Sequence, residues 1–221
     1  MLILSNVLFC QQIKSRNLEL DDIITLLEAS GYEVFSFDIT DMLKDYYDIT
    51  IIRKEYTKEG EVTSRNLQTL QNKVLLTEYS ESDRQKFVDE NRIIDPETMA
   101  VYHAEKLNIG FYPSGNDSTI RIQIHIPDFV TLNTSLKLRG LTMKDSERLL
   151  FNYNTRPFQT RAFEEELFIP LVLLGSMWYD EKYDIYRFCG EKEIDPDMSS
   201  ELLKDIPHYY IFGVKFVKKQ F

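Results

Sequence analysis

Two short acidic motifs, far apart in the chain, have the residue types that metal-dependent catalysis requires. Pro127-Asp128 lies at the end of one predicted strand, and Asp180-Glu181-Lys182 lies at the end of another. Many nucleases use this pattern: two carboxylates hold a divalent cation, the cation polarises the phosphate and activates water, and the lysine stabilises the developing charge. The pattern gives one functional hypothesis, a metal-dependent nuclease with Asp128, Asp180 and Lys182 as its catalytic residues.

Other features of the sequence count against a catalytic or metal site. The 51 residues between Asp128 and Asp180 are long for the nuclease pattern, and short acidic motifs arise by chance among 36 Asp and Glu. The structural alternative is a proline that ends a strand, together with a hairpin turn at "YDEKYD". His125 with Asp128 could form part of a composite metal site, but His103, His125 and His208 lack metal-ligand spacing and fit surface or cap positions better.

The sequence motifs of common enzyme classes are absent from the chain. It contains no glycine-rich phosphate loop, no HExxH and no GxSxG. This absence favours a non-enzymatic protein, although an active site assembled from scattered residues carries no such motif. We expect no cofactor and no metal.

The charges are distributed unevenly along the chain. The formal net charge is −10, yet residues 118–163 carry +4 and the rest −14. We rank salt bridges within the chain first as the explanation, self-association second and nucleic-acid binding third. The cations of this basic segment are Arg121, Lys137, Arg139, Lys144, Arg148, Arg156 and Arg161.

Two stretches have the composition of a protein interface. "FNYNTRPFQTRAF" (151–163) combines arginines with aromatics, and "YYIFGVKFVKK" (209–219) could be an edge strand that pairs with another chain. The alternatives are an ordered loop whose aromatics cap the core, and an edge that its lysines protect. The predicted partner-binding residues are Arg121, Arg139, Arg148, Arg156, Phe158, Arg161 and Tyr210.

The stretch "TIRIQIHIPD" (119–128) has the most regular alternation in the chain. Isoleucine occupies every second position from 120 to 126, and Arg121, Gln123 and His125 stand between. A strand places alternate side chains on opposite faces of a sheet. The isoleucines should therefore face the core, and the polar row should be the exposed face of an antiparallel sheet.

Several other elements follow from local patterns. Residues 18–32 predict a helix that ends at Gly31, residues 32–39 a strand, and Gly60 the turn of a hairpin. Helix starts are indicated at Ser80, Asp95, Thr142 and Asp195. The mixture predicts an α+β fold, mainly antiparallel sheet with several short helices.

The best break in the chain is "PSGND" (113–117). It suggests two α+β lobes, residues 1–114 and 115–221, with a single domain as the alternative. Cys10 and Cys189 are far apart, no signal peptide is recognised, and the longest apolar run, 167–179, is too short to span a bilayer. We expect a cytoplasmic protein, or one within a particle assembled in the cytoplasm.

Together these patterns favour a non-enzymatic interaction or structural assembly subunit, such as a subunit of an oligomeric or phage-type particle. The expected partners are other protein chains, either further copies or a basic protein, and neither a membrane nor nucleic acid. One alternative is an acidic inhibitor or immunity protein that masks a basic partner through electrostatic complementarity. The other is the metal-dependent nuclease.

Overall fold

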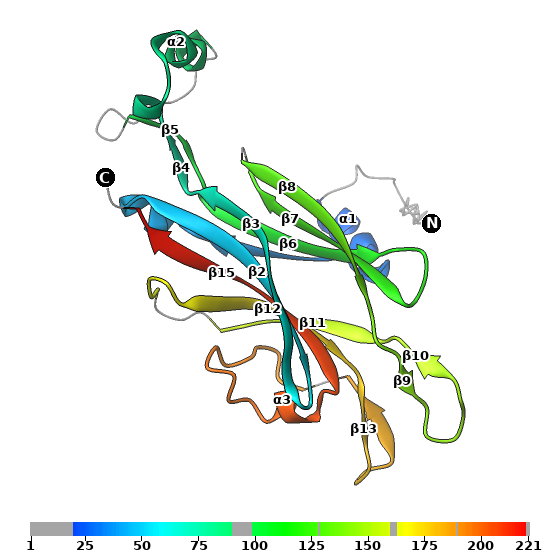
Figure 1. Ribbon diagram of the computed structural model, residues 1–221. Coiled ribbons are helices and arrows are strands. Elements are labelled where there is room, and N and C mark those ends of the chain that lie inside the picture. Colours follow the sequence, from blue (N-terminus) through cyan, green and yellow to red (C-terminus); the bar gives the residue numbers. More distant parts are fainter. Residues whose placement is uncertain (1–19, 90–98, 128, 160–162, 189, 220–221) are drawn as a thin grey trace, which may run out of the picture.

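A computed structural model describes residues 20–89, 99–127, 129–159, 163–188 and 190–219 (Figure 1). Two predicted site residues, Asp128 and Arg161, lie outside the described residues, as do both cysteines.

Two antiparallel sheets make up the body of the molecule. The four-stranded sheet has the order β1-β6-β7-β8. Its strands are β1 (Glu33–Asp38), β6 (Lys106–Pro113), β7 (Thr119–Ile126) and β8 (Val130–Lys137). The five-stranded sheet has the order β11-β12-β15-β2-β3. Its strands are β11 (Tyr153–Pro157), β12 (Phe168–Ser176), β15 (His208–Lys218), β2 (Tyr47–Thr57) and β3 (Gly60–Gln71).

The main core lies between these sheets, which form a β-sandwich. Phe111 on β6 meets Phe212 on β15 edge to face, with ring centroids 5.6 Å apart. Ile122, Ile124 and Ile126 are fully buried in the same cluster, whereas the polar side chains between them face outward. The alternation in this strand is therefore confirmed, and burial of its isoleucines fixes which face turns inward.

A second apolar cluster covers the other face of the five-stranded sheet. Leu173 and Ile211 on that face pack with Ile194, Leu203 and Ile206 from the segment that contains α3 (Leu202–Asp205). Both faces of the central strands β12 and β15 are consequently buried. This explains why their sequences are nearly continuous apolar runs.

The remaining elements lie around the sandwich. They are α1 (Leu20–Ala29), η1 (Thr40–Lys44), the hairpin of β9 (Leu141–Thr142) with β10 (Leu149–Leu150), the hairpin of β13 (Trp178–Asp180) with β14 (Ile185–Arg187), and the group β4 (Lys73–Leu75), η2 (Leu76–Glu78), α2 (Glu81–Asp89) and β5 (Ala100–His103). The predicted turns at Gly31 and Gly60 are confirmed, and both glycines have positive φ, +78° and +119°.

The predicted α+β class is wrong, because the fold is mainly β. The described part of the chain contains fifteen strands and three α-helices. The helix expected after Asp95-Pro96 is replaced by β5, which pairs with β4, and the helix expected after Thr142 is replaced by the β9–β10 hairpin. The helix expected after Asp195-Pro196 shortens to α3, because the Asp195 carboxylate accepts the N–H of Asp197 in a turn. Cap residues stabilise turns as readily as helix starts.

The predicted role of the C-terminal stretch as a sheet edge is also wrong. β15 lies between β12 and β2 and pairs with both along its length. The proposed break at 113–117 is the turn between β6 and β7 of one sheet, and both large sheets contain strands from either side of residue 115. The division into two lobes stays a prediction.

Candidate functional site

A slender arm leaves the sandwich at one end, in the upper left of Figure 1. We define the arm as residues 73–103, of which 73–89 and 99–103 are described; it contains β4, η2, α2 and β5. β4 and β5 form an antiparallel pair that carries η2 and α2 away from the body. Leu75 and Ala100 form a small buried cluster with Tyr46 of the body, at the root of the arm.

Asn72 holds the root of the arm in a fixed position. Its side chain is fully buried, and its Nδ2 donates to the carbonyls of Met42 (2.8 Å) and Asp45 (3.0 Å). Its Oδ1 accepts the backbone N–H of Tyr47 at 3.0 Å. Its own backbone N–H donates to the Tyr47 carbonyl, and its carbonyl accepts the N–H of Ala104. The satisfied amide fixes Asn72, the residue before β4, to the segment around the start of β2, and the backbone of Asn72 binds Ala104, the residue after β5.

Tyr46 makes the second connection between body and arm. Its hydroxyl donates to Glu78 Oε1 at 3.3 Å, and the Lys219 ammonium lies 5.1 Å from its ring centroid. Burial, together with the nearby Glu78 carboxylate, raises the pKa of Tyr46 to about 12. The phenol therefore keeps its proton, and its hydrogen bond to the arm, throughout the neutral range.

The outer part of the arm is ordered by local contacts. The predicted helix start at Ser80 is confirmed: its Oγ accepts the N–H of Asp83, and α2 begins at the next residue. The Tyr79 and Phe87 rings meet edge to face at 5.4 Å. Tyr79 and Met99 remain exposed, 39% and 38% respectively. Aromatic residues and methionine are among the residue types that are enriched in protein interfaces.

The two described residues of the nuclease hypothesis lie in the tight turn between β13 and β14. Asp180 Oδ1 accepts the backbone N–H groups of Lys182 and Tyr183, and Asp180 Oδ2 pairs with Arg187 Nε at 2.6 Å. The Lys182 ammonium lies 5.0 Å from the Tyr183 ring centroid. The structural alternative, a hairpin turn at "YDEKYD", is confirmed.

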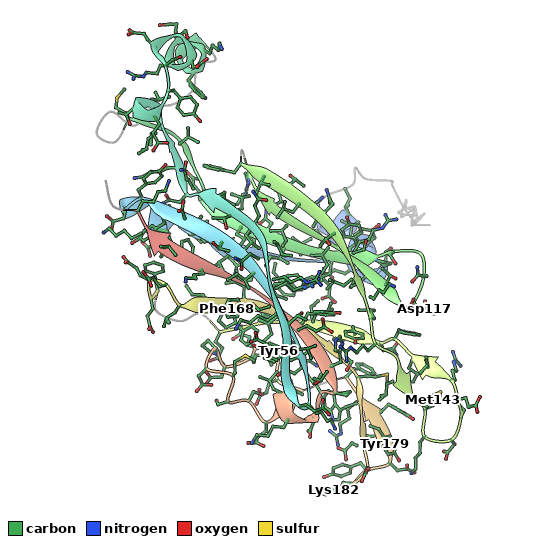
Figure 2. The ribbon with its side chains drawn as sticks, in the orientation of Figure 1. Tyr56, Asp117, Met143, Phe168, Tyr179 and Lys182 are labelled. Carbon is green, nitrogen blue, oxygen red and sulfur yellow. The ribbon has the colours of Figure 1, made fainter. Side chains whose placement is uncertain are left out.

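This turn is remote from the β7–β8 turn. Figure 2 shows Lys182 at the lower end of the molecule, whereas the β7–β8 turn is near the top of the sandwich. Asp128 itself lies outside the described residues. Across the described ranges, no group of three or more His, Cys, Asp or Glu is arranged to hold a metal ion. The structure therefore adds no support to a metal site at Asp180 and Lys182.

The predicted partner-binding residues are scattered. Arg121 is exposed on the outer face of the four-stranded sheet, and Arg148 is exposed in the β9–β10 hairpin. Arg156, Phe158 and Tyr210 are buried within this chain. A role in partner binding stays a prediction for these residues, and Arg161 lies outside the described residues.

Two cations of the basic segment pair with acids elsewhere in the chain. Arg139 Nη2 lies 2.7 Å from Glu55 Oε1, and Lys144 Nζ lies 2.7 Å from Asp184 Oδ1. These contacts agree with the first-ranked explanation for the split charge, salt bridges within the chain.

Sequence patterns missed a buried polar network around His208. The prediction of a surface or cap position for this histidine is wrong, because its side chain is only 3% exposed. Its Nε2 lies 3.2 Å from Glu55 Oε1, and its Nδ1 lies 2.5 Å from Tyr153 Oη. The network joins β2, β11 and β15 from distant parts of the chain, so no local spacing could indicate it.

The protonation states within this network follow from its burial. Desolvation lowers the pKa of His208, although the Glu55 carboxylate opposes that shift. The pKa of Glu55 is also lowered: burial acts to raise it, but hydrogen bonds from His208 and Arg139 outweigh that effect. Burial raises the pKa of Tyr153. At neutral pH the network therefore contains a carboxylate, a neutral imidazole and a protonated phenol.

These features define the class of protein. It is an antiparallel β-sandwich with a projecting arm and a buried Glu–His–Tyr network. The chain belongs to a family described as a domain of unknown function (DUF5041), whose model matches residues 3–218. No curated protein and no solved structure gives a significant match. Within the described ranges, no helix has the length and apolar character that crossing a membrane requires.

Proposed function

We propose that this protein is a non-enzymatic assembly subunit that uses its arm to bind a further protein chain, in the simplest case another copy of itself. The observation that carries this proposal is the arm, which leaves the sandwich and whose described residues, 73–89 and 99–103, add only Leu75 and Ala100 to a small buried apolar cluster. An isolated two-stranded hairpin is marginally stable in water. Contact with a partner would bury the apolar side chains that are exposed among the described residues of the arm.

The root of the arm supports the same proposal. Asn72, the residue before the arm, is held by buried and part-buried hydrogen bonds to the body, and Tyr46 of the body donates to Glu78 of the arm. An element that is already oriented loses less conformational freedom when it binds. A rigid root below an outer part with exposed Tyr79 and Met99 is the arrangement expected for an interaction element.

The test is the absolute molar mass in solution, measured by light scattering across a range of concentrations. The wild-type chain should exceed the monomer mass of 26.1 kDa as concentration rises. The double variant Tyr79→Asp/Met99→Asp should stay at the monomer mass, because it places charge on the exposed apolar part of the arm.

The matched control is Leu149→Asp/Ile185→Asp. It changes two similarly exposed apolar residues, 49% and 46%, in the hairpins at the other end of the molecule. The control should assemble like the wild type. A wild-type mass of 26.1 kDa at every concentration, or equal effects of the two double variants, would contradict assembly through the arm.

A further inference from the structure

The network around His208 contains one carboxylate oxygen with two donors. Glu55 Oε1 accepts from Arg139 Nη2 at 2.7 Å and from His208 Nε2 at 3.2 Å. Among the residues that the structure describes, the second carboxylate oxygen has one long contact, 3.4 Å, with Thr63 Oγ1. Arg139 and His208 therefore share a single acceptor atom.

One of these donors, Arg139, connects the five-stranded sheet to the segment that follows β8. Arg139 belongs to the 138–140 connection, which leads from β8 to the β9–β10 hairpin. Tyr210 Oη donates to the Lys137 carbonyl at 2.9 Å, and Tyr153 Oη accepts the Arg139 N–H at 3.0 Å. With the Arg139–Glu55 pair, these three contacts attach the end of β8 and the connection after it to the five-stranded sheet.

With a neutral imidazole, every group in the network has a partner. His208 Nε2–H donates to Glu55, and its Nδ1 accepts the hydroxyl proton of Tyr153. The Glu55 carboxylate then balances one full charge, the Arg139 guanidinium. The neutral network is therefore compatible with attachment of the connection.

A proton on Nδ1 changes these roles. The imidazolium donates to Tyr153 Oη, so the Tyr153 hydroxyl proton must turn to another acceptor. The Arg139 carbonyl, 3.3 Å from Tyr153 Oη, is available for it. The hydrogen bonds thus rearrange without loss, but two full cations now compete for the single charge of Glu55.

Exposure decides which cation leaves. The His208 side chain is 3% exposed and lies at the start of a central strand, so water hydrates its cationic form poorly where it stands. The Arg139 side chain is 51% exposed and can be solvated once it leaves Glu55. The groups that face the imidazole or its partners are Glu55 and Arg53 on β2, Tyr153 on β11, Tyr210 on β15 and Arg139 itself.

We propose that His208 is a proton-operated switch, in which the protonated imidazole takes over Glu55 Oε1 and releases the Arg139 guanidinium. Release removes the side-chain attachment of the 138–140 connection, which leads to the β9–β10 hairpin, whereas the hydrogen bonds of its backbone and of the end of β8 with Tyr153 and Tyr210 remain. The switch lies at the other end of the sandwich from the arm (Figure 1) and does not depend on the proposed role of the arm.

The experiment is a pH titration of the full chain followed by NMR, observing the His208 Cε1–H and the Arg139 Nε–H. The two resonances should change with the same midpoint, below the ordinary histidine value of 6.5. His208→Gln should abolish the Arg139 transition, and His125→Gln, which changes a histidine on the outer face of the other sheet, should preserve it. An Arg139 resonance that stays constant while His208 titrates, or unfolding before His208 titrates, would overturn the switch.

A second variant tests the competition itself and does not disturb the buried residues. Arg139→Met removes the competing cation from an exposed side chain, so the His208 midpoint should rise by about 0.5 to 1 pH unit. A purely structural role for Arg139 would leave the midpoint unchanged. An unchanged or lowered midpoint in Arg139→Met therefore contradicts the proposal.

Discussion

Replacing Asn72 with alanine should destabilise the protein strongly, because this side chain satisfies three backbone groups at the root of the arm. The substitution removes the acceptor for the buried Tyr47 N–H and the donor for the Met42 and Asp45 carbonyls. A buried polar group that loses its partner costs about 1 to 3 kcal/mol. Because the two carbonyls are only part-buried and can gain some hydration, we expect a total loss of about 3 to 5 kcal/mol.

The assay is equilibrium unfolding in urea. With a slope of about 2 kcal/mol per molar urea, this loss lowers the unfolding midpoint by about 1.5 to 2.5 M. Asn66→Ala is the matched control, because Asn66 is exposed on β3, a few residues before Asn72. The control should change the free energy of unfolding by no more than about 0.5 kcal/mol.

An isosteric variant separates hydrogen bonding from packing. Asn72→Asp keeps the volume of the side chain but replaces the Nδ2 donor, which serves two carbonyls, with an oxygen. It should cost at least as much as Asn72→Ala, because a buried carboxylate then faces carbonyl oxygens. The reasoning is refuted if Asn72→Ala costs less than about 1 kcal/mol, or if Asn72→Asp is as stable as the wild type.

Three further predictions test the sandwich and the network. Ile124→Ala should cost about 2 to 5 kcal/mol in urea unfolding, whereas Gln123→Ala on the exposed face should cost less than about 0.5 kcal/mol. Gly213→Ala should unfold the protein or cost more than about 3 kcal/mol, because the added Cβ would collide with a backbone carbonyl and an aromatic ring on β12. Gly110→Ala is the control, because its Cβ would make ordinary contacts at 3.6 Å or more, and it should cost about 1 kcal/mol or less. Thermal melting measures both changes. Because folding lowers the pKa of His208, the unfolded chain binds more protons than the folded chain just below pH 6.5. The free energy of unfolding should therefore fall as the pH drops from 6.5 toward the pKa of the folded state. Urea titrations at several pH values should show this slope in the wild type and not in His208→Gln.

Local sequence patterns were sufficient to predict elements in which each face has the same surroundings along its whole length. The alternation from 120 to 126 specified both faces of β7, because each isoleucine enters the same core. Gly60 indicated the β2–β3 hairpin, since a tight turn needs positive φ there. Ser80 indicated the start of α2 through a contact only three residues long.

Tertiary structure decided the features that depend on residues far apart in the chain. β5 is a strand because it pairs with β4, although residues 96–107 have the pattern of a capped helix. β15 is central because β12 and β2 bury both of its edges, whereas its lysines suggested an exposed edge. Capping patterns act over a few residues and contain no information about which strands become neighbours.

The candidate sites divide in the same way. The acidic motif at Asp180 was visible in the sequence, and its alternative as a hairpin turn is what the fold contains. The network of Glu55, Tyr153 and His208 was not visible in the sequence. Its members lie up to about 150 residues apart in the chain and meet only when three strands pair. The sequence by itself determined which apolar side chains are buried in the core. The packing of the two sheets determined which polar groups are buried with them.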